Sequence, residues 1–132
     1  MLSKIFAPLL LLTFGVLAQP PIDHGAKSCR DRTDLVGRCF TVHGRLSVYN
    51  GNPSIRLWRI GTKRMLGVRD PEEVSGGGPG LPTIPDYIRE KLNFDKNVYG
   101  DFMVCPLTRS EPGRMQIICI ESGKNLIVTE RE

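Results

Sequence analysis

CFTVHGRLSVYNGNPSIRLWRIGTKRMLGV, residues 39–68, is the stretch that decides the fold, because apolar residues recur in it at every second position. Such alternation is typical of β-strands that bury one face. A first predicted strand, beginning near Gly37, ends at NGNP, residues 50–53, which is a strong turn signal. A second strand over residues 55–60 and a third over residues 64–68 follow. The stretch therefore predicts a three-stranded meander.

Residue parity assigns the side chains of the first two strands to two faces. The apolar positions are even in the first strand and odd in the second, which requires an even-length loop. A two- or four-residue turn at residues 50–53 satisfies that condition. The face opposite the apolar one is the predicted binding surface, made of His43, Arg45, Tyr49, Arg56 and Trp58. The alternative is that Trp58 packs under a neighbouring segment and that the arginines are only solvated.

The rest of the chain predicts one helix and further strands. A glycine-rich connection, residues 69–82, lacks the Lys-Ser/Thr of a phosphate-binding loop. A short amphipathic helix follows, capped by Thr83, with its apolar stripe on Ile84, Tyr87, Ile88 and Leu92. Residues 98–107 and 114–122 predict two more strands, and residues 126–128 a short tail strand.

This order of elements, three strands, a helix and two strands, resembles the OB-fold, a small five-stranded Greek-key barrel. A long first strand interrupted by Gly44 also looks like that pattern. We therefore expect residues 37–132 to form a mostly β domain, a five- to six-stranded OB-like barrel with one short helix between strands 3 and 4. A six-stranded sandwich is the alternative. The segments CFTVHGRLSVYNG and GTKRMLGV also resemble small uncharacterised exported bacterial proteins, which implies no activity.

The N-terminus predicts export. A positive start ending at Lys4 precedes an apolar run over residues 5–18, and Val16 and Ala18 are small residues suited to signal peptidase. We expect residues 1–18 to be a signal peptide, with periplasmic or secreted localisation and no membrane span after cleavage. A buried N-terminal helix is the alternative. Residues 19–36 are polar and turn-rich, and predict an extended N-terminal arm.

The four cysteines follow the predicted cleavage site, and export favours two disulfides among Cys29, Cys39, Cys105 and Cys119. A three-residue loop in the last hairpin would place Cys105 directly opposite Cys119. The predicted pairs are therefore Cys105–Cys119 and Cys29–Cys39. Because Pro112 disfavours the backbone that such a loop needs at Glu111, a shorter turn and a Cys39–Cys105 pair remain the alternative.

Catalytic signals are weak. The chain has no nucleophile elbow and no zinc-type spacing of cysteine and histidine, so no catalytic residue, metal or cofactor is predicted. His24 falls in the arm. His43 would act as a base only beside an orienting carboxylate, and residues 38–69 contain none. We interpret Asp95 and Asp101 as turn carboxylates.

Charge points to the class of partner. Residues 38–69 carry a formal +7, whereas the other residues of the predicted mature chain carry a net −4. This asymmetry favours anionic partners. We expect a non-catalytic exported binding module for anionic envelope glycans or cell-wall material, and not for nucleic acid. The alternative is a structural or inhibitory domain that docks an acidic protein surface, and a small hydrolase is a weaker one. The sequence does not determine the oligomeric state.

Overall fold

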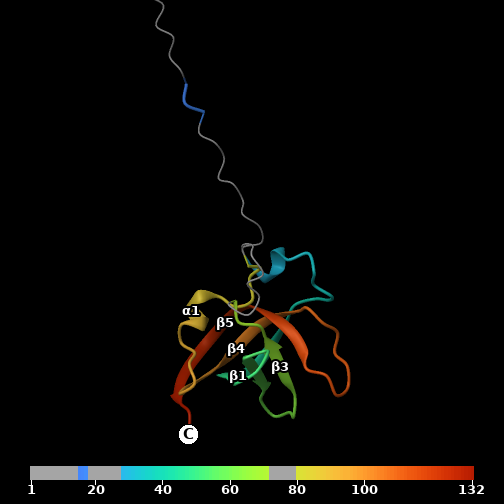
Figure 1. The fold of residues 1–132 in the computed structure, drawn as a ribbon, viewed down its shortest axis with the longest axis vertical. Helices are drawn as coiled ribbons and strands as arrows, with labels where there is room; N and C mark the ends of the chain where they lie inside the picture. The colour runs from blue at the N-terminus through green and yellow to red at the C-terminus, as the bar shows by residue number, and fades with distance from the viewer. Residues whose placement is uncertain (1–14, 18–27, 72–79) are drawn as a thin grey trace, which may run out of the picture.

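The computed structural model of the protein describes residues 15–17, 28–71 and 80–132 (Figure 1). Most of the predicted signal peptide, the arm up to residue 27 with His24, and residues 72–79 of the glycine-rich connection lie outside the described residues. The described part is mostly β, as the alternating pattern predicts. None of its helices is long and apolar enough to cross a membrane.

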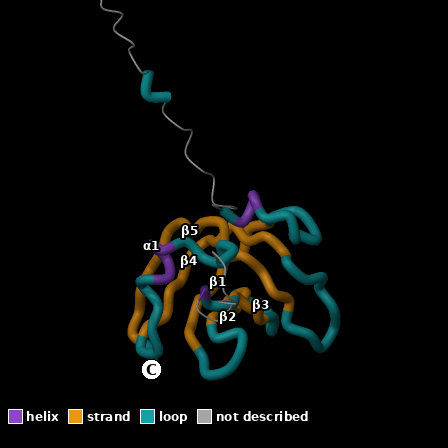
Figure 2. The backbone as a smooth tube through the Cα atoms, turned by 45° about the horizontal axis from the view of Figure 1, so that its top comes forward, coloured by secondary structure: helices purple, strands orange, loops and turns teal. Residues whose placement is uncertain are grey.

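Within the described residues, five strands form one sheet. They are β1 (Phe40–Val48), β2 (Ile55–Arg59), β3 (Met65–Val68), β4 (Lys96–Pro106) and β5 (Gln116–Glu130). A 3-10 helix, η1 (Cys29–Asp31), precedes β1, and a short helix, α1 (Asp86–Arg89), lies between β3 and β4. Figure 2 shows the strands curving around a common centre, with α1 beside β4 and β5.

The sheet closes on itself in the order β1-β2-β3-β5-β4. β1 pairs antiparallel with both β2 and β4, and β4 pairs antiparallel with β5. The closing contact between β3 and β5 is parallel and short, through Leu66 with Gln116 and Gly67 with Ile117. β1 therefore lies in the middle of a broad surface, with β2 on one side and β4 on the other.

The core lies inside this closed sheet. Its largest fully buried side chains include Leu46, Leu57, Leu66, Phe102 and Ile118. The predicted register of β1 with β2 is confirmed, because Val48 pairs with Ile55 and the Tyr49 N–H donates to the Ser54 carbonyl, leaving a four-residue loop. Gly44 is on the inner face, and a Cβ there would lie 2.6 Å from Leu57 Cδ1. The strand can therefore approach β2 closely only because this residue has no side chain.

The prediction of a separate tail strand is wrong. β5 runs without a break from Gln116 to Glu130 and stays paired with β4. The register shifts between the pairs Asp101–Lys124 and Tyr99–Ile127, and Asn125 in this interval has a φ of 54°. An extra residue in a left-handed conformation is how a β-bulge bends a strand without ending it. The polar residues at 121–125, which suggest an interruption, belong to this bend.

The predicted helix is shorter than its apolar stripe. α1 begins after Pro85 and has no side-chain cap, so the prediction of Thr83 as its cap is wrong. The Thr83 carbonyl instead accepts a hydrogen bond from the Ile120 N–H at 2.8 Å, which keeps this residue extended beside β5. Ile84, Ile88 and Leu92 are buried as predicted, but Tyr87 is 45% exposed.

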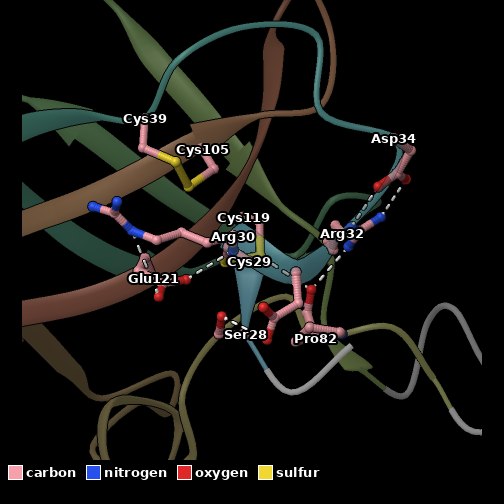
Figure 3. The surroundings of a disulfide bond; sticks show 11 residues. Ser28, Cys29, Arg30, Arg32, Asp34, Cys39, Pro82, Cys105, Cys119 and Glu121 are labelled. Carbon is pink, nitrogen blue, oxygen red and sulfur yellow. Dashed lines mark hydrogen bonds and ion pairs between the residues drawn. A yellow bond between two sulfur atoms is a disulfide. The ribbon is translucent and has the colours of Figure 1, made fainter. Parts of the chain in front are cut away.

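Both preferred disulfide pairs are wrong, although all four cysteines are bonded and the alternative pair, Cys39–Cys105, is present. The disulfides join Cys29 to Cys119 and Cys39 to Cys105 (Figure 3). The predicted register of Cys105 opposite Cys119 is correct. Cys105 has a second neighbour, however, because the β1–β4 register brings Cys39 to a Cα–Cα distance of 4.1 Å. Two disulfides are consistent with an oxidising compartment.

The described end of the arm is fastened to the sheet by more than a disulfide. Cys29, Cys105 and Cys119 form a small second core with Leu35, Cys39 and Leu107 packed against it. Arg32 bridges two segments, since its guanidinium bonds the Asp34 carboxylate at 2.6 and 2.8 Å and the Pro82 carbonyl at 2.8 Å (Figure 3). The Arg32–Asp34 hydrogen bond lowers the pKa of the Asp34 carboxyl. The arm therefore covers part of the outer surface of β4 and β5.

Candidate functional site

The outer face of β1 and β2 brings the predicted binding residues together. Arg45 pairs with Trp58 across the ladder, and Ser47 pairs with Arg56. His43 is exposed, whereas Arg45, Tyr49, Arg56 and Trp58 are half-buried. These side chains therefore share the outer face, as their residue parity predicts. Their ring and charge contacts follow from the packing around each side chain.

Trp58 supports an arginine. The Arg45 guanidinium carbon lies 4.9 Å from the centre of the Trp58 ring, a cation–π distance. The indole Nε1–H donates to the Thr62 carbonyl at 2.7 Å, which ties the ring to the β2–β3 turn. Trp58 is thus neither a bare platform for a ligand nor a core residue. It holds Arg45 in place on the outer face.

Tyr49 is in contact with two further arginines. Arg56 from β2 lies 4.9 Å from the ring centre, and Arg131, which follows β5, lies 4.7 Å from it. Both arginines are also fixed by backbone oxygens. Arg56 Nε donates to the Pro53 carbonyl at 3.1 Å, and Arg131 Nη1 donates to the Val48 carbonyl at 2.5 Å. We call Arg45, Arg56 and Arg131 with their rings Trp58 and Tyr49 the arginine surface.

A groove of about 620 Å³ adjoins this surface between β1, β4 and the end of β5. We call it the β1–β4 groove. It is lined by Arg45, Ser47, Tyr49, Asn97, Tyr99, Thr129, Glu130, Arg131 and Glu132. In the groove, Ser47 Oγ donates to Asn97 Oδ1 at 2.6 Å, which leaves the amide nitrogen of Asn97 as a donor. The lining is rich in hydroxyl and amide groups, with arginines and glutamates beside them.

Arg45 is a groove residue whose bonding is incomplete. Its Nε is buried, and within the described residues it has no hydrogen-bond partner. The ion pairs found in the described part of the chain do not include Arg45. A buried donor without a partner costs about 1–3 kcal/mol. Because Arg45 lines the β1–β4 groove, an acceptor bound there would bond the accessible part of the guanidinium, while the covered Nε stays out of its reach.

His43 lies beside a carboxylate from another strand, although residues 38–69 contain no acidic residue. His43 Nδ1 lies 2.7 Å from Asp101 Oδ1, and Asn125 Nδ2 donates to Asp101 Oδ2 at 3.0 Å. The interpretation of Asp101 as a turn carboxylate is wrong, because it lies within β4 directly opposite His43. The Asn125 hydrogen bond, and then the His43 contact, lower the pKa of Asp101. The three side chains come from β1, β4 and the bend of β5.

Several site residues are absent from the predicted set, namely Asn97, Tyr99, Thr129 and Arg131. The parity of β4 puts Tyr99 and Asp101 on the face opposite the buried Val98 and Phe102, so their exposure to the outer side has a sequence signal. Their position beside β1 depends on strand pairing. Arg131 follows the last strand and has no local signal.

Not all of the basic run belongs to the arginine surface. Arg64 Nη2 bonds Ser110 Oγ at 2.5 Å and Gln116 Oε1 at 2.7 Å, so it links the segment before β3 to the last hairpin. Arg59, Lys63 and Arg69 are exposed outside the groove. The described residues contain no group of three or more His, Cys, Asp or Glu side chains that could hold a metal ion.

No protein-family model matches the chain, and comparison with curated proteins and with solved structures finds no match either.

Proposed function

We propose that this protein is a non-catalytic binding module that holds an anionic ligand at the arginine surface and the adjoining β1–β4 groove. The observation that carries the proposal is Arg45, a half-buried residue whose guanidinium is stacked on Trp58, lines the groove and has no hydrogen bond or ion pair among the described residues. A cation held in this way is ready to bind an anion without rearrangement. Carboxylates and phosphates fit the forked donors of a guanidinium.

The aromatic rings support this role by fixing the arginines. An arginine side chain loses about 2 kcal/mol of rotamer entropy when it becomes ordered. Stacking on Trp58 and Tyr49, and the backbone hydrogen bonds of Arg56 and Arg131, impose that order before a ligand arrives. The ring contacts therefore increase affinity by organising the cations, and the rings do not need to stack on the ligand themselves.

We also propose that the closed sheet is an OB-type barrel. The strand order β1-β2-β3-β5-β4, the parallel β3–β5 contact and the helix between β3 and β4 support that assignment. OB-folds bind oligosaccharides and oligonucleotides on an outer face of this kind. The predicted signal peptide and the two disulfides favour an exported protein. Outside the cytoplasm, anionic glycans and cell-wall material are more abundant ligands than nucleic acid.

The test uses the fluorescence of Trp58, the only tryptophan of the chain. The mature protein is titrated with an anionic polysaccharide at low and at physiological salt. We expect a saturable fluorescence change that weakens as salt rises. Arg45→Gln should lose most of the affinity, and Arg45→Lys should lose part of it, because lysine lacks the forked donors.

Arg109→Gln is the matched control, since it removes the same charge from an exposed position outside the groove. It should bind like the unmodified protein. Equal losses in Arg45→Gln and Arg109→Gln would mean that net charge alone attracts the polymer, and would overturn the proposal. Binding of an acidic protein but of no anionic polysaccharide would favour the alternative of a protein-docking domain.

A small hydrolase is a second candidate because of the pair formed by His43 and Asp101. A carboxylate that bonds Nδ1 at 2.7 Å fixes the ring and leaves Nε2 for proton transfer, as a general base requires. The imidazole is 67% exposed, however, and does not line the β1–β4 groove, so water is not excluded from it. Turnover of a glycan ester that disappears in His43→Ala would favour this candidate over the binding module.

A further inference from the structure

We infer that the ligand is an acidic polysaccharide whose sugar units carry one carboxylate each together with free hydroxyls, and that His43 and the β1–β4 groove select the hydroxyls. This inference rests on the proposed function, since it assumes that Arg45 binds the anionic group. It adds the chemistry of the ligand around that group.

The outer side chains of β1 and β4 form a ladder of polar pairs. His43 faces Asp101 and Arg45 faces Tyr99 in the β1–β4 register, and one step further Ser47 hydrogen-bonds Asn97. Arg45 is therefore the one cation in the middle of this ladder, with hydrogen-bonding groups on both sides along the strands. A ligand anchored at Arg45 would meet His43 on one side and Asn97 on the other within one residue pair, while the buried Ser47 holds Asn97 in place.

The imidazole of His43 is oriented so that one of its ring nitrogens can bond a hydroxyl group. Asp101 occupies Nδ1, and Asn125 holds the other oxygen of that carboxylate. Nε2 is left without a partner among the described residues. Nε2 accepts a hydrogen bond when the imidazole is neutral and donates one when it is protonated. A hydroxyl, which both donates and accepts, fits both states, whereas a carboxylate or phosphate oxygen fits only the protonated one.

The charges of the groove argue against a densely charged polymer. Arg45 and Arg131 line it together with Glu130 and Glu132, so the acidic groups oppose a chain of closely spaced phosphates. Glu130 is also paired with Lys96. The other lining groups are neutral and polar, as the amide of Asn97 and the hydroxyl of Thr129 illustrate. A sugar unit with one carboxylate and several hydroxyls matches this mixture of charged and neutral groups better than a chain of closely spaced phosphates.

Four polymers separate the features of the ligand. Polygalacturonate has carboxylates and hydroxyls, polyacrylate has carboxylates only, polyphosphate has phosphates only, and dextran has hydroxyls only. Binding of the mature protein to each is measured at physiological salt from Trp58 fluorescence. We expect polygalacturonate to bind most tightly per charged unit, and dextran to bind least.

His43→Ala tests the role of the imidazole. Because this side chain is 67% exposed, the variant should fold. We expect it to weaken binding of polygalacturonate by about two- to tenfold, the effect of one hydrogen bond, and to leave binding of polyacrylate unchanged. Thr41→Ala, an exposed position on the same strand face, is the matched control and should change neither affinity.

The outcomes distinguish the two proposals. If polyacrylate or polyphosphate binds as tightly as polygalacturonate, the anion site stands and the selection of hydroxyls is wrong. If His43→Ala weakens the binding of polyacrylate and of polygalacturonate equally, His43 does not recognise hydroxyls. If none of the anionic polymers binds, or if dextran binds as well as they do, both the proposed function and this inference are wrong.

Discussion

Cys105 lies directly opposite Cys119 in the β4–β5 ladder, yet each is bonded to a different cysteine, Cys39 and Cys29. Cys105 in β4 therefore lies between Cys119 in β5 and Cys39, which directly precedes β1. An alternative disulfide between Cys105 and Cys119 is within reach whenever one of the existing bonds is open. The native pairing depends on the arm being in place.

This arrangement predicts disulfide exchange when the arm is released. In Cys29→Ser, the Cys119 thiolate is expected to attack Cys105, form a Cys105–Cys119 bond and release the thiolate of Cys39. Removing a bridge that closes a loop of 90 residues should also cost about 2–5 kcal/mol. Non-reducing peptide mapping after thiol alkylation would detect the new pair. In the double variant Cys29→Ser/Cys119→Ser, the Cys39–Cys105 bond should persist. A Cys29→Ser protein with only Cys119 alkylated would contradict the prediction.

Gly44 gives a prediction about packing. A Cβ at this position would lie 2.6 Å from Leu57 Cδ1 and 2.7 Å from the Trp58 carbonyl, so Gly44→Ala must push β1 and β2 apart. Overpacking of this kind costs about 1–3 kcal/mol, and the free energy of unfolding measured with denaturant should fall by that amount. Gly80→Ala is the control, because no atom of the described residues lies within 4 Å of a Cβ placed there. Equal stability of both variants would show that the strands adjust freely.

Asp101 gives a prediction about pH. Hydrogen bonds from Asn125 and His43 lower the pKa of this carboxyl in the folded protein below its ordinary 3.8. The carboxylate therefore stabilises the fold above pH 3.8, and this contribution is lost as pH falls through the lowered folded pKa. Asp101→Asn should be less stable than the unmodified protein near pH 7, and the difference should shrink in acid. Asp95→Asn, which removes the same charge from an exposed turn residue, is the matched control for the loss of one negative charge. If the difference in stability does not change with pH, the charge of Asp101 does not contribute, and the substitution acts only by altering the packing around residue 101.

The predictable part of the fold and site is the part that depends on short-range patterns. Alternation along residues 39–68 determines the β1–β2 register, and that register determines that Arg45 is beside Trp58. The remaining features need long-range pairing. The Cys39–Cys105 bond and the His43–Asp101 pair both follow from the β1–β4 register, in which 66 and 58 residues separate the partners. Arg131 reaches Tyr49 only because β5 continues through the bend at Asn125, which its polar sequence conceals.

The two roles of Trp58 can be separated by two substitutions. Trp58→Phe keeps a ring under Arg45 but loses the hydrogen bond to the Thr62 carbonyl, so it should cost about 1 kcal/mol of stability and leave affinity for an anionic polysaccharide nearly unchanged. Trp58→Ala loses the ring as well. Its stability loss should be larger than that of Trp58→Phe, but smaller than the ~3–5 kcal/mol typical of a buried aromatic, because Trp58 is half-buried.

Affinity should respond differently from stability. Without the ring, Arg45 loses a cation–π contact worth about 0.5–2 kcal/mol, and binding to Trp58→Ala should weaken by a similar free energy. Isothermal titration calorimetry is the suitable measurement, since both variants lack the fluorescent residue. If Trp58→Ala binds as tightly as Trp58→Phe while being much less stable, Trp58 is only a packing residue. In that case the arginines of β1 and β2 do not depend on it for their position.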